Sequence, residues 1–268
     1  MEILDRKCFN LLDEEIRAMG EFAREKQKNI HRSFKNDGSV LTETDLAIST
    51  HISEMVHRLF PTCNMISEEE KSGFNPDAPF TFILDPIDGT DMYSQGMTTF
   101  AVALGILDRN RQPVGGIIDA PRCGIARDYM HVSLYPGDEV YLDGEVFTPM
   151  DQKDDVREIM CTGHELSNYD FSSYHGKMRS FGSSILHAIL PAFLRDTQAC
   201  LTQPCYAWDI AASHAIIRKL GMDVSYMDGR LMEYTDRMLI ERKTCDEDII
   251  TGTFAAREQL RKMITRRK

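Results

Sequence analysis

Apolar residues with a helical period mark the first sixty positions of the chain. They recur every three or four residues over 3–23, and again from Ala47 to Phe60, where Pro61 ends the pattern. The segment KNDGSV at 35–40 has the composition of a turn. The sequence therefore predicts two amphipathic helices separated by a turn.

Short apolar runs typical of strands follow these helices. CNMIS at 63–67 and the run at 80–84 each fit one strand, and 98–121 fits two strands joined by a polar turn. EVYLDGEVF at 139–147 carries the Asp-Gly signal of a hairpin. These patterns predict an α+β first half.

The second half alternates between the two periods. Residues 158–162 fit a strand, 183–194 a helix, and 208–220 a helix that Gly221 stops. Two more strands, within 223–231 and 248–253, and a basic terminal helix complete the chain. This order predicts an α/β (α+β mixed) protein of layered sheets and helices. The polar segment MDQKDDVR at 150–157 divides it into predicted halves, 1–150 and 151–268.

Composition narrows the classes of function. The 268 residues include 31 basic and 42 acidic side chains, and the net charge of −11 disfavours binding to nucleic acid or to an anionic membrane. The chain has neither an apolar run long enough to span a membrane nor a signal-peptide pattern at its start, so we expect a cytoplasmic protein. Seven cysteines without a C-x-x-C pair favour free thiols.

The sequence FILDPIDGT at 82–90 places two aspartates at the end of an apolar strand. Pro86 is expected to lead the chain off the sheet, and Gly89 to let a ligand approach the backbone. Carboxylates about 4 Å apart repel by about 1 kcal/mol in water and about 4 kcal/mol at an effective dielectric of about 20. Asp85 and Asp88 thus favour a cation such as Mg²⁺, Mn²⁺ or Ca²⁺, and the alternative is a turn capped by aspartate.

Acidic residues at three further places in the chain carry alternative interpretations. Glu68–Glu70 follow a predicted strand that can lie beside the 80–84 strand, although such a run is often a solvated loop. Asp45 completes a capping-box pattern with Thr42, and Asp209 stands at the beginning of a helix. Each of these signals is weak when taken singly.

Taken in order, Asp45, Glu68-Glu69, DPIDGT at 85–90 and Trp208-Asp209 resemble the lithium-sensitive, magnesium-dependent phosphatases. This family includes the inositol monophosphatases, the 3′-phosphoadenosine 5′-phosphate phosphatases and the fructose-1,6-bisphosphatases. The resemblance spans nearly the whole chain. It implies a layered αβαβα sugar-phosphatase fold and hydrolysis of a small phosphate monoester by metal-activated water.

The resemblance also implies a role for each matching residue. Glu68, Asp85 and the carbonyl of Ile87 would hold one Mg²⁺, and Asp85, Asp88 and Asp209 a second; a third, weaker ion would use Glu68, and Mn²⁺ could substitute. Thr90 and Asp45 would orient and deprotonate the attacking water, with Glu69 in support. The implied substrate contacts are Asp88, Gly89, Thr90, Gly182, Ser183 and Ser184.

One departure from the pattern concerns the substrate. Inositol monophosphatases carry a glutamate six residues before the WD tryptophan, and Thr202 stands there in this chain. Inositol phosphates, sugar phosphates and nucleotide 3′-phosphates all stay open as substrates. The family also implies a homodimer. The alternatives to an enzyme are a catalytically silent protein that binds metal or sugar phosphate, and a purely structural acidic protein.

Overall fold

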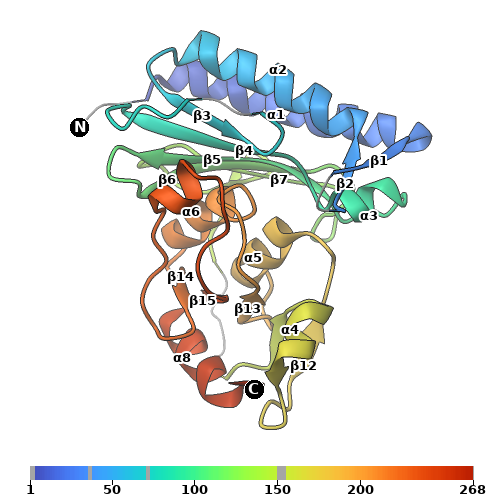
Figure 1. The fold of residues 1–268 in the computed structure, drawn as a ribbon, viewed down its shortest axis with the longest axis vertical. Coiled ribbons are helices and arrows are strands. Elements are labelled where there is room, and N and C mark those ends of the chain that lie inside the picture. Colours follow the sequence, from blue (N-terminus) through green and yellow to red (C-terminus); the bar gives the residue numbers. More distant parts are fainter. Residues whose placement is uncertain (1–3, 36–37, 71–72, 150–154, 268) are drawn as a thin grey trace.

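A computed structural model describes residues 4–35, 38–70, 73–149 and 155–267, and these residues stack in alternating layers. Helices α1 (Arg6–Lys26) and α2 (Glu43–Leu59) cover one face of a first sheet, and α5 (Ser184–Phe193) and α6 (Ala211–Lys219) lie against its other face (Figure 1). A second sheet follows, covered by α8 (Phe254–Met263). The layered mixed α/β prediction is confirmed.

The first sheet contains seven strands within the described residues, in the order β3-β4-β5-β6-β7-β8-β9. Strand β3 is parallel to β4, and every other neighbouring pair is antiparallel. The strands are β3 (Asn64–Ser67), β4 (Phe80–Asp88), β5 (Ala101–Asp108), β6 (Pro113–Ala120), β7 (Met130–Leu134), β8 (Tyr141–Leu142) and β9 (Glu145–Val146).

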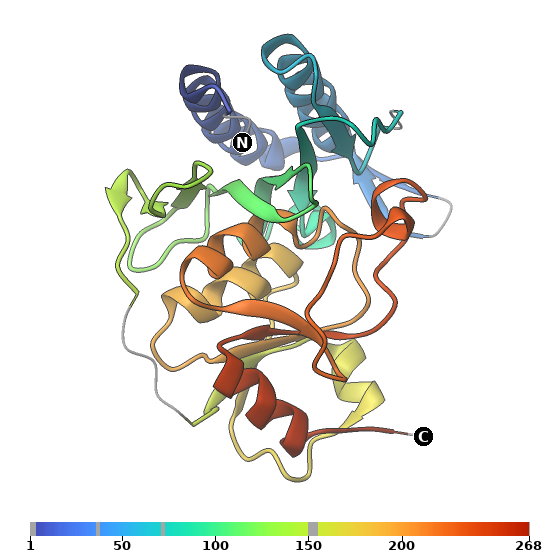
Figure 2. The same ribbon diagram turned by 90° about the vertical axis from the view of Figure 1, so that its left-hand side faces the viewer.

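The second sheet has the order β12-β10-β13-β15-β14 within the described residues, and Figure 2 shows it below α5 and α6. Its strands are β10 (Glu158–Met160), β12 (Lys177–Arg179), β13 (Ala199–Thr202), β14 (Asp223–Tyr226) and β15 (Ile249–Gly252). The remaining elements are β1 (Arg32–Phe34), β2 (Val40–Thr42), α3 (Thr90–Ser94), α4 (Gly163–Asn168), β11 (Tyr169–Asp170), α7 (Asp236–Leu239), β16 (Thr265–Arg266) and the 3₁₀ turn η1 (Gln27–Asn29).

Successive side chains of β4 point to opposite faces of the sheet and so pack into two different hydrophobic cores. Phe82 and Leu84 pack with α1 and α2, whereas Ile83 belongs to the core shared with α5 and α6. Helix α6 approaches this second face very closely, because a Cβ on Gly105 of β5 would lie 2.5 Å from the Cβ of Ala211. The turn before α6 therefore lies near the end of β4.

The expectation that Pro86 leads the chain off the sheet at residue 85 is wrong. Strand β4 continues to Asp88, with a shift of register between Asp85 and Asp88 in its pairing with β5. Residues three apart in a regular strand point to opposite faces. The extra residue of this bulge brings Asp88 back to the face of Asp85.

The boundary predicted at residues 150 and 151 lies outside the described residues, so the division into halves stays a prediction. Within the described part, the helices predicted at both ends of the chain and the Asp143-Gly144 hairpin are confirmed. The predicted 35–40 turn falls partly on residues that are not described. No helix of the described residues is long and apolar enough to cross a membrane.

A buried histidine connects α1 to the first sheet. His131 on β7 lies 2.8 Å from the Asp119 carboxylate on β6 through Nδ1, and 2.9 Å from the Asp13 carboxylate on α1 through Nε2. Burial alone lowers the pKa of His131, but the two carboxylates together raise it to about 9. The protonated imidazole therefore holds the helix against the sheet.

This histidine should make the stability of the protein depend on pH. Because the pKa of His131 is raised from 6.5 to about 9, its contribution is complete below pH 6.5 and is lost as the pH rises through about 9. We expect His131→Gln to lower the free energy of unfolding by about 3 kcal/mol at pH 6 and by less at pH 9.5, as measured by urea denaturation.

His51→Gln is the matched control. His51 pairs with Glu15 at 2.7 Å between α2 and α1, but its side chain is 49% exposed, so we expect a loss below about 1 kcal/mol. An equal loss for His131→Gln at both pH values would contradict the assigned ion pair.

Candidate active site

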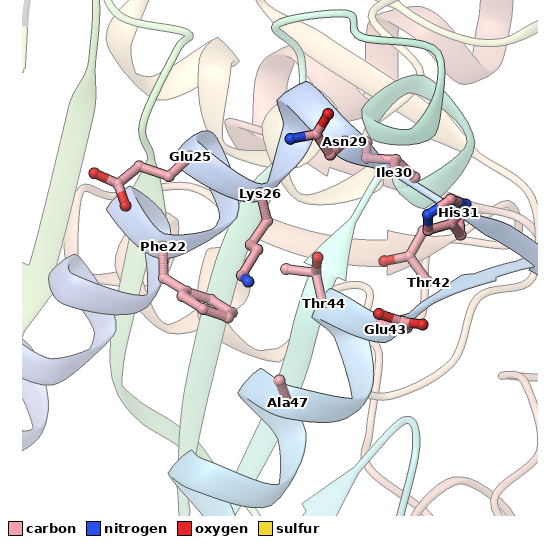
Figure 3. Close-up of a pocket in the computed structure, with 10 residues that line it drawn as sticks. All are labelled: Phe22, Glu25, Lys26, Asn29, Ile30, His31, Thr42, Glu43, Thr44 and Ala47. Atoms are coloured by element: carbon pink, nitrogen blue, oxygen red, sulfur yellow. The ribbon is translucent and has the colours of Figure 1, made fainter.

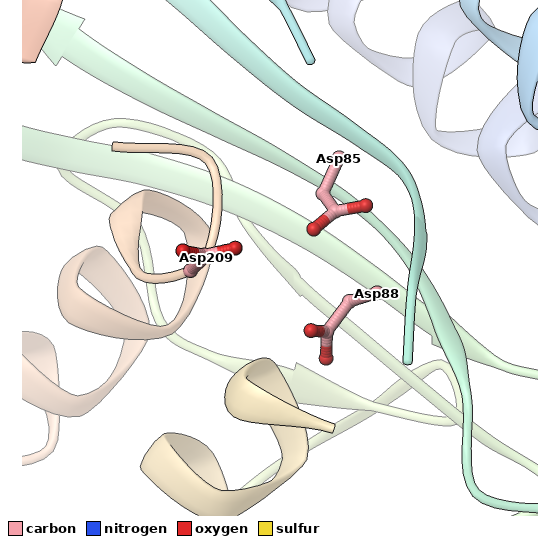
Figure 4. Close-up of side chains that lie close together, drawn as sticks. All are labelled: Asp85, Asp88 and Asp209. Atoms are coloured by element: carbon pink, nitrogen blue, oxygen red, sulfur yellow. The ribbon is translucent and has the colours of Figure 1, made fainter. Parts of the chain in front are cut away.

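Three aspartates from two distant parts of the chain meet at the end of β4. Asp85 and Asp88 come from the bulged end of the strand, and Asp209 comes from the turn that precedes α6 (Figure 4). One carboxylate oxygen of each lies within 4.8 Å of the others, and this is the one group of potential metal ligands found among the described residues.

Burial of these carboxylates in close proximity is electrostatically unfavourable. It raises the pKa of Asp85 well above its usual value, and neighbouring carboxylates add to the effect. The pKa of Asp209 is likewise well raised, first by burial and then by Asp88 and Glu68. Asp85 Oδ1 is buried without a hydrogen-bond partner among the described residues. An oxygen-only donor set with an unpartnered buried oxygen fits a hard divalent cation.

Asp88 differs from the other two aspartates because both of its oxygens accept hydrogen bonds from the beginning of α5, whereas Asp209 accepts through Oδ2 from the Tyr206 N–H. Its Oδ1 accepts from the backbone N–H of Ser184 at 3.0 Å, and its Oδ2 accepts from the backbone N–H of Ile185 at 2.9 Å and from the Ser183 hydroxyl. Burial raises its pKa to about 6, against the effect of these donors. A carboxylate from the first sheet thus caps helix α5.

Gly89 allows the β4 end and the α5 end to approach each other. Its φ of +85° is left-handed, and a Cβ would lie 3.0 Å from the Thr99 carbonyl oxygen and 3.1 Å from the Gly182 carbonyl oxygen. A side chain would meet both a strained backbone and crowded neighbours. The predicted substrate residues Gly89, Gly182 and Ser183 are therefore brought together in the structure.

Asp45 and Thr90 are also brought together. Thr90 Oγ1 lies 3.1 Å from Asp45 Oδ1 and 2.7 Å from the Ile87 carbonyl oxygen, either of which can accept its proton. The second Asp45 oxygen accepts from the Thr42 backbone N–H at 3.0 Å, in the capping box expected at the beginning of α2. Burial raises the pKa of Asp45.

Glu68 and Glu69 lie outside the aspartate group and share a lysine. Lys35 Nζ is 2.6 Å from a Glu68 oxygen and 2.5 Å from a Glu69 oxygen. Burial alone would lower the pKa of Lys35, but the two carboxylates raise it overall. The pKa of Glu68 rises to about 7, mainly because of burial. Glu68 is still close enough to influence Asp85, since its N–H donates to the Leu84 carbonyl at 3.2 Å.

Two cationic residues at the site are absent from the predicted set. Lys35 follows β1 and pairs with the glutamates, and Arg242, from the loop after α7, donates to the carbonyl oxygens of Ser67 and Glu68. Arg242 lies in none of the motifs that predicted the other site residues. The local signal that could have suggested Lys35 is the acidic run itself, which needs a counter-charge.

A separate cavity of about 470 Å³ lies between α1 and the beginning of α2 (Figure 3). Its lining in Figure 3 includes Lys26, Thr42 and Glu43, and none of the predicted site residues. We assign it no role in the chemistry.

Comparisons with known proteins agree with the geometry. A model of the inositol monophosphatase family matches residues 4–262. Nus factor SuhB of Haemophilus influenzae is 25% identical over 215 residues, which are 74% of this chain and 75% of that protein. The 3′(2′),5′-bisphosphate nucleotidase CysQ of Escherichia coli K12 is 25% identical over 214 residues, which are 76% of this chain and 82% of that protein.

A solved structure supports the same fold. An IMPase/NADP phosphatase complexed with Mg²⁺ and phosphate superposes with a TM-score of 0.77 at 15% sequence identity. The match covers 96% of this chain and 95% of that one. At this identity the likeness concerns the fold.

The repulsion at the site predicts a stabilising substitution. We expect Asp85→Asn to raise the free energy of unfolding of the metal-free protein at pH 7.5 by about 1 kcal/mol or more, because one pKa unit corresponds to about 1.4 kcal/mol. The measurement is urea denaturation in the presence of EDTA.

The pH dependence has a defined sign. The site carboxyl groups have higher pKa values in the folded protein than in the unfolded chain, so the stability of the metal-free protein falls as the pH rises above about 4. The fall continues through the pKa values of Asp88, about 6, and Glu68, about 7. Asp85→Asn should flatten this fall. Asp77→Asn, at an exposed position before β4, is the control and should change nothing; destabilisation by Asp85→Asn alone would contradict the assigned repulsion.

Proposed function

The chain belongs to the inositol monophosphatase family, and from this membership we propose that it hydrolyses small phosphate monoesters with the help of bound Mg²⁺. The family makes it a phosphatase of small phosphorylated substrates. The observation that carries the metal-dependent part is the group of buried Asp85, buried Asp88 and half-buried Asp209, in which Asp85 Oδ1 has no hydrogen-bond partner among the described residues.

The donor set decides between metals. Three carboxylates without thiolate or imidazole suit Mg²⁺ or Mn²⁺ better than Zn²⁺. Asp85, Asp88 and Asp209 are the proposed ligands of one ion, and Glu68, Asp85 and the Ile87 carbonyl of another, with a third ion at Glu68. Ions held there supply positive charge for a phosphate dianion and lower the pKa of water. The structure with Mg²⁺ and phosphate supports this choice.

Thr90 and Asp45 are proposed to manage the proton of the attacking water. The Thr90 hydroxyl lies between the Asp45 carboxylate and the Ile87 carbonyl, so a proton given to Thr90 can pass to Asp45. Burial raises the pKa of Asp45, which improves it as a proton acceptor. Glu69 is proposed to support Asp45 electrostatically.

The substrate is proposed to lie over the junction of the β4 end with the beginning of α5. Asp88, Gly89 and Thr90 come from the β4 side of this junction, and Gly182, Ser183 and Ser184 from the α5 side, and the two sides are in direct contact because Asp88 caps α5. Thr202 on β13 is buried and cannot supply the carboxylate that inositol recognition uses in the family. We therefore propose a sugar or nucleotide phosphate ahead of inositol phosphate.

Two broader predictions accompany this function. The chain is proposed to be divided at residues 150 and 151, so that the first half carries most ligands and the second carries Asp209 and the 182–184 contacts. A homodimer is also proposed, and light scattering coupled to size-exclusion chromatography measures it directly.

Loss of one metal ligand should remove activity while the fold is retained. We expect Asp209→Asn to lower kcat/KM with Mg²⁺ at least about 100-fold. Loss of a residue that only supports a metal ligand lowers activity about 10- to 100-fold, and loss of a ligand itself should lower it at least as much. The circular dichroism spectrum should be unchanged. Asp228→Asn, on an exposed turn, is the control. A variant that is inactive only because it is unfolded would indicate a structural role for Asp209.

A substrate panel tests the proposed substrate class. We expect higher kcat/KM for 3′-phosphoadenosine 5′-phosphate, NADP or fructose 1,6-bisphosphate than for inositol 1-phosphate, because Thr202 replaces the glutamate. Turnover should require Mg²⁺ or Mn²⁺, and millimolar Li⁺ should inhibit it. A clear preference for inositol 1-phosphate would contradict the role given to position 202, and turnover in EDTA would contradict the metal requirement.

A further inference from the structure

We propose that Arg242 is a positioning residue that joins the Glu68 end of β3 to the Trp208-Asp209 turn and thereby sets the affinity for divalent cations. This inference rests on the proposed metal-dependent function. Arg242 lies in the loop after α7, and none of the proposed metal ligands comes from this loop.

The contacts of Arg242 span the two sides of the site. Its Nη2 donates to the Ser67 carbonyl and lies 3.5 Å from the Glu68 carbonyl oxygen, at the point where β3 ends. Its Cζ lies 5.2 Å from the centroid of the Trp208 ring, one residue before Asp209. One guanidinium therefore contacts the backbone that presents Glu68 and the side chain that precedes Asp209.

Trp208 is itself fixed by its neighbours. The Tyr206 ring stacks on it with centroids 4.6 Å apart and planes 6° apart. The Tyr206 backbone N–H donates to Asp209 Oδ2 at 2.7 Å. A change at the Trp208 ring is thus transmitted to the Asp209 carboxylate within the same short turn.

The loop that carries Arg242 is braced on both sides. The Lys243 N–H donates to the Arg237 carbonyl at 2.9 Å, and Arg237 Nε donates to the Thr244 carbonyl at 2.9 Å. Next in the chain, the Cys245 N–H donates to the Cys205 carbonyl at 2.9 Å, which attaches the loop to the chain just before Tyr206. This bracing is suited to holding one side chain in a fixed direction.

The backbone at Arg242 is strained. Its φ is +55°, in the left-handed region that costs a residue with a Cβ of the order of 1 kcal/mol. Such strain persists only where the surroundings impose it. At Arg242 the surroundings are the loop hydrogen bonds on one side and the β3 carbonyls with Trp208 on the other.

The chemistry of arginine explains the choice of residue. A planar guanidinium can donate to adjacent carbonyls while its face lies on an aromatic ring, which an ammonium does less well. Burial lowers the pKa of Arg242, and the charges of Glu68 and Glu69 oppose this. The positive charge therefore also stabilises these carboxylates in the absence of ions.

Calorimetric titration of the full chain with Mg²⁺ alone tests the proposal. We expect Arg242→Met to raise the Kd for Mg²⁺ about tenfold or more, because outer-sphere partners change metal affinity about 10- to 100-fold. Arg242→Lys, which keeps the charge but loses the fork and the stacking, should fall between Met and the parent. A second readout is the Mg²⁺-dependent change in fluorescence of Trp208, the one tryptophan of the sequence.

Arg109→Met is the matched control, because its Nη2 donates to the Asp77 carbonyl at 3.0 Å, before the start of β4. It should leave the Kd unchanged. A Kd for Arg242→Met within twofold of the parent, or below it, would overturn the positioning role while the proposed function stands. If the Arg242→Met variant does not fold, a Kd for Arg242→Lys within twofold of the parent would overturn the positioning role instead. A parent that binds neither Mg²⁺ nor Mn²⁺ would overturn the proposed function itself, together with this inference.

Discussion

Mutual repulsion of buried carboxylates is the constraint around which this molecule is organised. Asp85, Asp88 and Asp209 are held closer together than their charges favour, in a place where water screens them little. The protein offsets part of the repulsion with donors: the N-terminus of α5 at Asp88, the Tyr206 N–H at Asp209, and Lys35 at the two glutamates. Among the described residues, Asp85 keeps one buried oxygen without a hydrogen-bond partner, and a cation bound there would offset the repulsion most directly.

The three aspartates are brought together by a β-bulge and two glycines within otherwise regular strands and helices. Two aspartates three residues apart would point to opposite faces of a regular strand, and the bulge in β4 places them on one face. Gly105 then lets α6 lie close to the sheet, and Gly89 lets the strand end meet the 182–183 segment. The ordinary hydrophobic layers hold these few unusual positions in place.

Those parts of the fold and of the candidate site that depend on local hydrophobic periodicity or on a sequence motif could be predicted from the sequence. Helix periods predicted α1 and α2 well. The ordered motifs include the three aspartates that the structure brings within 4.8 Å of one another, whereas Glu68 and Glu69, also in the motifs, pair with Lys35 outside that group. The continuation of β4 through Pro86 was not predictable, because a proline at a bulge needs no ladder hydrogen bond there and its effect depends on the β5 partner. Strand β13 and the short hairpin β1–β2 lack strong alternation. Arg242 acts through carbonyl groups distant in sequence, and no pattern in its own segment records those contacts.

The cap that Asp88 provides to α5 has a consequence for how the protein is made. The residues that it joins are separated by 95 to 97 positions. During synthesis the end of β4 must therefore leave the ribosome long before the helix that neutralises it, and contacts of such long sequence separation form slowly. The Asp88 carboxylate therefore lacks these donors until residues 183–185 have been synthesised, and the candidate site cannot be completed before then.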